Sequence, residues 1–350
     1  MIVAYNRIYN RMDIEQIKLY RLINQHLLDP ADCITVVRDL CGIQAQFLSN
    51  ALHAIRIRST DMSADSANNL IRSWAIRGTM HIFAQEDLPL MLYKGRSHFL
   101  RPCDTMAGDE SITHDRKVYF SNLIIDSIAA GITARDELKE VCFSHGMSET
   151  EAESIFNAWG GLIRALCESG RICYTIQKGK SLRICPEFEP LEADTAQIEL
   201  ARRYFTNYAP ATIKDAAYFF ATTQAQVKKW LSQLPITSTI CDGKQYFSIA
   251  TGRNYNYSIA PCIFLAGFDP LMLGYRKEDS LYLPEEHIRK VFTLTGIIKP
   301  TVLYYGKIIG TWSLKRNKLT ITPFEPLSAQ VKKQIEDHAQ LTFNESVCIC

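Results

Sequence analysis

Two glutamines, Gln44 and Gln46, flank a single alanine in the otherwise apolar stretch "LCGIQAQFLSN" at residues 40–50. A primary amide offers a carbonyl oxygen that accepts hydrogen bonds and an amino group that donates them. Unlike a carboxylate, it is too weak a base to accept a proton from a reacting group. A pair of such side chains can therefore hold a water molecule and a polar ligand, but it cannot act as a general base.

The spacing alone says little, because "TTQAQVKKW" at residues 222–230 carries Gln224 and Gln226 in the same arrangement. On a continuous helix, residues two apart point about 200° away from one another. Both amides can face one cleft only if the chain is bent or extended there. Gly42 supplies a break before the first pair, whereas we interpret the second pair as the solvated first turn of a helix that follows a Thr223 cap.

The elements that must position these residues repeat along the chain. Residues 133–186 read as a helix capped by Thr133, a break at Gly146, a helix with a capping box at Ser148, and two strands. Residues 212–249 repeat this order, with an Asp-Gly hairpin turn at residues 242–243. Helix, turn, helix and hairpin in this order are typical of a winged-helix unit.

The N-terminal hundred residues fit a looser third copy. We expect helices at about 14–28, 32–41, 45–57 and 64–73, and then a short hairpin in "WAIRGTMHIF" that turns at Arg77 and Gly78. After residue 255, short β-type runs separated by Gly and Pro predict a small β-barrel or sandwich, closed by a helix at about 328–341. The fold class is thus α+β, with units at 1–110, 111–192, 193–252 and 253–350.

Composition excludes several classes of protein. The formal net charge is +2 over 350 residues, so the chain is no histone-like polycation, although a local basic face is still allowed. No run of eighteen apolar residues and no signal peptide is present, which predicts a cytoplasmic, nucleoid-associated protein without a membrane segment. The 11 cysteines are odd in number and form no Cys-x-x-Cys. We expect reduced core cysteines, no metal and no cofactor.

Basic residues gather on the expected hairpins and helix ends. Residues 171–183 carry no acidic residue, and neither do residues 299–318. The basic residues in these two ranges are Arg171, Lys178, Lys180, Arg183, Lys299, Lys307, Lys315, Arg316 and Lys318. Several such runs on wings and hairpins favour contact with nucleic-acid phosphates.

Longer blocks resemble those of the AlkZ-like winged-helix DNA glycosylases. The blocks are "CGIQAQFLSNALHAIRIRS", "LIRSWAIRGTMHIFAQEDL", "ARRYFTNYAPATIKDAAYF", "FDPLMLGYRKEDSLYLP" and "GIIKPTVLYYGKIIGTWSLKR". The resemblance covers nearly the whole chain. It implies three winged helices followed by a β-barrel, bent into a C shape around double-stranded DNA. It also implies removal of alkylated bases, including N7-alkylguanine and, in some members, bases within interstrand crosslinks.

The family's Gln-apolar-Gln catalytic motif falls on Gln44, Ala45 and Gln46, which places the chain in the glutamine branch rather than the branch with Asp at the second position. Phe47 departs from the polar residue expected after the motif. The hairpin "GKIIGTWSLKR" is a candidate for insertion into a DNA groove, with Trp312 in the core. The expected DNA contacts are Arg56, Arg58, Arg77, Thr79, His81, Lys178, Lys180, Arg202, Arg203, Lys228, Lys315 and Arg316.

Alternatives stay open at this point. His81 is either a DNA contact or a core histidine, and Asp269 in "GFDP" is either a helix cap or, with Asp39, a substitute catalytic carboxylate. Three interpretations of the chain remain: a monofunctional DNA glycosylase, which we expect to be a monomer, a non-catalytic DNA-binding regulator or damage sensor, and a protein-interaction scaffold. Release of N7-methylguanine from alkylated DNA separates the first of these from the others.

Overall fold

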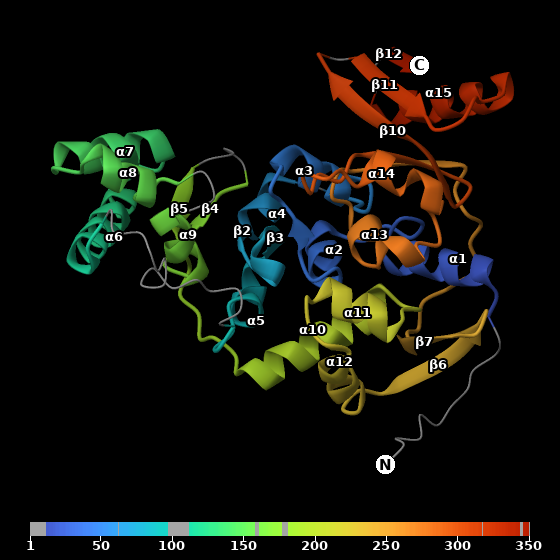
Figure 1. The fold of residues 1–350 in the computed structure, drawn as a ribbon, viewed down its shortest axis with the longest axis horizontal. Coiled ribbons are helices and arrows are strands. Elements are labelled where there is room, and N and C mark those ends of the chain that lie inside the picture. The colour runs from blue at the N-terminus through green and yellow to red at the C-terminus, as the bar shows by residue number, and fades with distance from the viewer. Residues whose placement is uncertain are drawn as a thin grey trace. The chain divides into compact units, whose positions relative to one another are not determined.

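The computed structural model describes residues 12–61, 63–96, 112–157, 161–176, 181–316, 318–343 and 346–349. The chain divides into two compact units, one made of Met1–Met62 with Ile198–Cys350 and the other of Ser63–Gln197 (Figure 1). Both units mix helices and strands, which confirms the α+β class. The division into four consecutive units stays a prediction.

The first unit contains the glutamine motif. Its helices are α1 (Ile14–Asn24), α2 (Cys33–Asp39), α3 (Leu48–Arg56), α11 (Ile213–Phe219), α12 (Gln224–Leu231), α13 (Pro270–Leu273), α14 (Ile288–Val291) and α15 (Ala329–Phe343). Its strands are β1 (Ile43–Gln44), β6 (Ile236–Cys241), β7 (Lys244–Ile249), β8 (Cys262–Leu265), β9 (Thr301–Tyr304), β10 (Lys307–Lys315), β11 (Lys318–Pro323) and β12 (Ser346–Ile349). Helix α10 (Ala193–Asn207) begins in the second unit and ends in the first.

The C-terminal strands form one sheet in the order β12–β11–β10–β9–β8. Within the described residues the sheet is open, because β12 and β8 lie at its two edges, and so it is not the closed barrel expected. Strand β12 pairs parallel to β11 and was not predicted. Helix α15 covers the sheet and shares a core with it that includes Trp312, Val302 and Ile335, which confirms the core position of this tryptophan.

The helix–helix–hairpin order at residues 212–249 is confirmed. The Thr212 side chain caps α11 in a capping box with Asp215, and Thr223 caps α12. Strands β6 and β7 pair in register from Ile236–Ile249 to Cys241–Lys244. Asp242 and Gly243 take φ values of 47° and 72°, which is the left-handed conformation that a tight hairpin turn requires.

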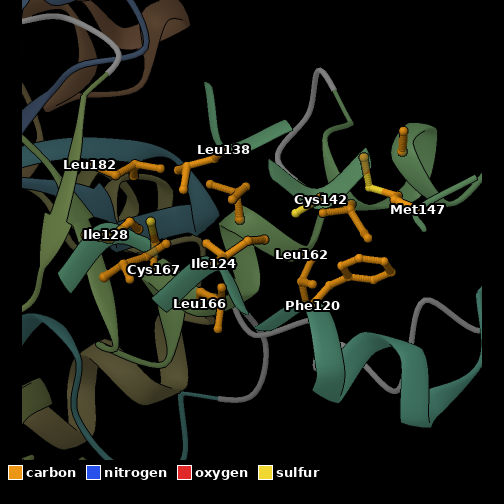
Figure 2. Packing of buried hydrophobic residues seen from close by; sticks show 14 of the residues in the cluster. Phe120, Ile124, Ile128, Leu138, Cys142, Met147, Leu162, Leu166, Cys167 and Leu182 are labelled. Atoms are coloured by element: carbon orange, nitrogen blue, oxygen red, sulfur yellow. The ribbon is translucent and has the colours of Figure 1, made fainter. Parts of the chain in front are cut away.

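The second unit holds helices α4 (Ala64–Asn68), α5 (Leu88–Met91), α6 (His114–Ala129), α7 (Arg135–Ser144), α8 (Glu149–Ile155) and α9 (Gly161–Glu168). Its strands are β2 (Leu70–Trp74), β3 (Met80–Ala84), β4 (Ile172–Tyr174) and β5 (Leu182–Ile184), and they lie in the sheet order β3–β2–β4–β5. Apolar side chains of α6, α7 and α9 gather in one core with Leu182 of β5, as Figure 2 shows.

Two local predictions in this unit were wrong. The helix expected at 64–73 ends at Asn68, because the next residues pair with β3 and β4 and bury nearly every side chain along β2. Thr133 is not the cap of α7, which begins after Ala134 without a side-chain cap. The Thr133 carbonyl instead accepts from Leu182 N, and Ala134 bridges to Ser181, so strand pairing holds this backbone.

Eight cysteines among the described residues are buried and carry reduced thiols, as expected. In the part of the chain that the structure describes, no helix is both long and apolar enough to cross a membrane.

Candidate active site

The two glutamines of the motif lie on an extended segment rather than a helix. Cys41 and Gly42 turn the chain with φ values of 56° and 81°. The next residues form β1, and α3 begins only at Leu48. Because residues two apart in an extended chain point to the same side, the amides can meet. Gln44 Nε2 donates to Gln46 Oε1 over 2.7 Å.

Burial divides the tasks of the two residues. Gln44 is 8% exposed and Ala45, between them, is fully buried, whereas Gln46 is exposed. The Gln44 amino group occupies one lone pair of the Gln46 oxygen and leaves the other available. The buried glutamine thus orients the exposed one, whose carbonyl oxygen and amino group can face a substrate.

The turn that leads into this segment is held by the end of α10. Three successive carbonyls at the C-terminus of α2 receive side-chain hydrogen bonds. Arg203 Nη1 donates to Arg38 O, Asn207 Nδ2 to Asp39 O and Tyr208 Oη to Leu40 O, each at 3.0 Å. The last carbonyls of a helix have no partner within the helix, so these donors both satisfy them and fix the chain just before Gln44.

This arrangement corrects one expected DNA contact. Arg203 is 7% exposed and also donates through Nε to Glu199, so its guanidinium supports the protein rather than reaching a phosphate. Arg202 is exposed and pairs with Glu199 on the helix surface. It stays a candidate for DNA contact.

Asp39 belongs to a polar network, which argues against its use as a catalytic carboxylate. Its Oδ2 accepts from His26 Nε2 over 2.8 Å and from Arg253 Nη2 over 2.7 Å. Arg253 donates further to Asn207 Oδ1 and to Asn24 O. The network joins α1, α2, α10 and the segment before β8, and so it is structural support for the glutamine segment.

A buried ion pair fixes the other side of α3. Arg58 and Asp269 are both fully buried, and the guanidinium donates from Nη2 to Oδ1 (2.6 Å) and from Nη1 to Oδ2 (3.1 Å). Asp269 also caps α13 by accepting from Leu271 N. The prediction that Arg58 contacts DNA is therefore corrected, and Asp269 is confirmed as a cap.

The loop before Asp269 lies against the start of α3. The rings of Phe47 and Phe268 stack with centroids 5.7 Å apart. A Cβ at Gly267 would lie 2.6 Å from Asn50 Nδ2 and 3.0 Å from the backbone oxygen of Ile298, so a larger residue here would crowd both neighbours. Phe47, which departs from the polar residue expected at this position, thus packs on the loop with one face and leaves about half of its surface exposed beside Gln46.

Helix α3 is tied to the sheet as well. His53 Nε2 donates to Phe264 O over 2.7 Å, and its ring stacks on Phe343. Burial lowers the pKa of His53, so the ring is neutral and serves as a donor. Helix α3, which begins directly after the motif, is thereby held by buried contacts.

The remaining predicted DNA contacts fall into three groups. Four lie exposed and stay candidates: Arg56, Lys228, Lys315 and Arg316. Arg77 and Thr79 are half-buried in the turn between β2 and β3 and also stay candidates. Lys178 and Lys180 lie outside the described residues.

His81 is a buried histidine rather than an exposed cation. It is 2% exposed and its Nδ1 donates to Thr79 O over 2.9 Å. Burial, aided by the nearby Arg77 charge, lowers the pKa of His81 to about 3. A neutral buried ring cannot neutralise a phosphate, so the core interpretation is confirmed and the DNA-contact interpretation is corrected.

The second Gln-Ala-Gln has the setting expected for it. Gln224 is the first residue of α12, both glutamines lie in its first turn, and the backbone N–H of Gln226 donates to the Thr223 hydroxyl. Among the described residues, no group of three or more His, Cys, Asp or Glu is placed to hold a metal ion.

Sequence similarity identifies the class of protein to which this α+β chain with its extended amide pair belongs. Residues 37–342 match the sequence profile of the family described as "DNA glycosylase AlkZ-like". The match spans most of the chain, and the protein belongs to this family of DNA glycosylases, DNA-repair hydrolases that act on N-glycosidic bonds.

Two relatives make the similarity concrete. The chain is 25% identical over 328 residues to a Streptomyces sahachiroi protein named "Interstrand DNA cross-link repair glycosylase", covering 87% of this chain and 88% of that one. It is also similar to the solved structure of Streptomyces sahachiroi DNA glycosylase AlkZ, with a TM-score of 0.74 and 22% identity. That match covers 97% of this chain and 100% of the other.

Proposed function

We propose that this chain is a monofunctional glycosylase that hydrolyses the N-glycosidic bond of N7-alkylated purines in double-stranded DNA, with a water molecule positioned by Gln44 and Gln46. The observation that carries the proposal is the 2.7 Å hydrogen bond between the two amides on an extended segment. It gives the exposed amide of Gln46 a fixed orientation, which positioning of a reactant requires.

Amides suit this reaction because of its leaving group. The transition state of glycosidic hydrolysis resembles an oxocarbenium ion, and ordinary glycosidases protonate a poor leaving group with a carboxylic acid. An N7-alkylated purine is already cationic and leaves as a neutral base, so it needs no such acid. The enzyme must hold a water against C1′, and the second lone pair of Gln46 Oε1 can accept a hydrogen bond from that water.

We further propose that the substrates include bases within interstrand crosslinks, as the name of the Streptomyces relative suggests. Most glycosylases flip the target base into a pocket, but a base tethered to the opposite strand cannot be fully flipped. The catalytic amide must then reach the lesion within the helix. The exposure of Gln46 supports such a mode of attack.

Binding is proposed to depend on basic side chains and on winged-helix units. The pair α11 and α12 with the hairpin β6–β7 has the element order of such a unit, and Lys228 is exposed on α12. At the end of the hairpin β10–β11, Lys315, Arg316 and Lys318 are all exposed, which favours contact with phosphates. This hairpin is the proposed element for groove insertion.

The test is release of free N7-methylguanine from methylated duplex DNA, followed by release from crosslinked DNA. Wild-type protein releases the base, and Gln46→Ala binds the same DNA without releasing it. Gln46→Glu keeps an oxygen for Gln44 and for the water, and its activity falls as the pH drops below the ordinary carboxyl pKa of about 4.3. Salt-sensitive binding without base release by the wild type would instead indicate a non-catalytic DNA-binding protein.

A further inference from the structure

The most exposed leucine among the described residues lies at the tip of a short loop. Leu294 is 87% exposed, and Ile297 in the same loop is 37% exposed. A single exposed apolar side chain needs no explanation, since most protein surfaces contain some. Leu294 differs from an ordinary surface leucine in two respects: the loop that carries it has a fixed shape, and the base of this loop contacts Phe268, which packs on the residue that follows the glutamine motif.

The loop is held in a fixed shape. Phe292 and Ile298 pair as an isolated β-bridge at its base. Thr293 N donates to Ile297 O over 2.9 Å, and Ile297 N donates to the Thr293 hydroxyl over 3.0 Å. Gly296 takes a φ of 79°, which closes the turn. The leucine is thus carried on a braced turn.

The base of this loop adjoins the glutamine segment. Phe268 N donates to Ile298 O over 3.3 Å, and the ring of Phe268 stacks on Phe47, which directly follows Gln46. A Cβ at Gly267 would also lie 3.0 Å from Ile298 O, so the two loops are in direct contact. The same scaffold therefore carries both the catalytic amide and the exposed leucine.

The flanks of the loop carry positive charge. Between His287 and Pro300 the basic residues are Arg289, Lys290 and Lys299, all exposed, and there is no Asp or Glu. Cations on both flanks with an apolar tip are the combination that minor-groove proteins use, in which the cations contact phosphates and the tip enters between base steps. The loop thus has the chemistry of a DNA wedge.

We propose that Leu294 inserts between stacked base pairs beside the lesion and separates them, while Arg289 and Lys299 contact the flanking phosphates. This inference rests on the proposed function of the glutamine pair. For a lesion that cannot be flipped, local unstacking by a wedge opens the sugar C1′ of the damaged nucleotide to the water on Gln46 without extruding the base.

The test uses a matched pair of leucines. Leu341 on α15 is 86% exposed and belongs to the same unit, so Leu341→Ala removes equal side-chain volume from another surface. A DNA duplex carries N7-methylguanine on a 2′-fluoro sugar, which slows cleavage, with 2-aminopurine as its neighbour. Unstacking raises the fluorescence of 2-aminopurine when protein binds. Single-turnover base release is measured on the cleavable duplex.

Wild type, Leu341→Ala and the conservative Leu294→Met are expected to raise the fluorescence, whereas Leu294→Ala loses most of the rise. Leu294→Ala is also expected to release the base about tenfold more slowly, because unstacking one step costs a few kcal/mol that the wedge helps to offset. Equal fluorescence and equal rates for the two alanine variants would overturn the proposal. So would an effect of Leu294→Ala on self-association alone, measured by sedimentation.

The two proposals can fail separately. If no form of the protein releases a base, the glycosylase function fails. A fluorescence rise that Leu294→Ala alone removes would still support the wedge.

Discussion

The two Gln-Ala-Gln segments have the same side chains and the same spacing, yet they differ in every physical respect. In the first, Cys41 and Gly42 turn the chain into an extended segment, and Gln44 donates directly to Gln46. In the second, a threonine cap starts a helix immediately, and two glutamines two positions apart diverge around the helix axis. The backbone that precedes the residues decides whether two amides act together.

The largest expected effect comes from breaking the buried Arg58–Asp269 ion pair, which supports the first Gln-Ala-Gln segment and has no counterpart at the second. Asp269→Ala leaves the fully buried guanidinium of Arg58 without its counter-charge, and we expect a loss of about 3–5 kcal/mol in the free energy of unfolding, measured in urea. The control Asp279→Ala breaks an exposed pair with Lys244 and should cost below about 1 kcal/mol. Equal losses for both variants would contradict the role given to the buried pair.

In the second unit, the surroundings of His81 also determine what its side chain can do, because burial keeps the imidazole neutral. The pKa of His81 is about 3 in the folded chain, against about 6.5 for an ordinary histidine, so between these two pH values the unfolded chain binds a proton that the folded chain does not. Stability is therefore lost as the pH falls through this window. Between pH 8 and pH 5 the expected loss from His81 is about 2 kcal/mol.

To test this, urea unfolding of wild type and of His81→Leu is measured at pH 8 and at pH 5, with a spectroscopic probe that reports on the second unit. The variant is expected to lose less stability on acidification than the wild type does. If both lose the same amount, the histidine is not held neutral by burial.

Tyr208→Phe tests the turn before the first segment more gently. The variant removes the hydroxyl that donates to Leu40 O and leaves a buried carbonyl unpaired, which costs about 1–2 kcal/mol. Because the turn positions Gln44, single-turnover base release should also slow, by about tenfold. Tyr304→Phe, which loses a hydroxyl contact to Gln334 elsewhere in the unit, serves as the control and should keep its rate.

The smallest expected effect belongs to the second segment. Gln224→Ala with Gln226→Ala exchanges two side chains in the first turn of α12 and should change the free energy of unfolding by less than about 0.5 kcal/mol. A thermal melt beside the wild type measures it. A large destabilisation would mean that this copy, too, has a structural task.

Much of the fold follows from local signals in the sequence. The capping box at Ser148 and the Asp242–Gly243 turn both appear where the residues predict them, because these interactions involve residues close in the chain. The helix expected at 64–73 failed at Leu70, where pairing with two distant strands outweighs local preference. The parallel pairing of β12 is equally non-local.

The site divides in the same way. The motif and the break at Gly42 were visible in the sequence, but the supports were not. Arg58 and Arg203 were expected to contact DNA, but Arg58 is a buried partner of Asp269 and Arg203 a buried partner of α2. The positive charge of a residue does not by itself show whether it binds a phosphate or another part of the protein. The braced loop at Leu294 left only a weak signal, an apolar residue between two threonines before a glycine.

The account's central claim is tested most directly by single-turnover release of N7-methylguanine from duplex DNA by two double variants measured side by side. Gln44→Ala/Gln46→Ala should lose release by about a hundredfold or more while keeping its affinity for the DNA, because it removes only the positioned water. Gln224→Ala/Gln226→Ala should release the base at the wild-type rate. Full activity in the first variant, or an equal loss in both, would contradict the claim.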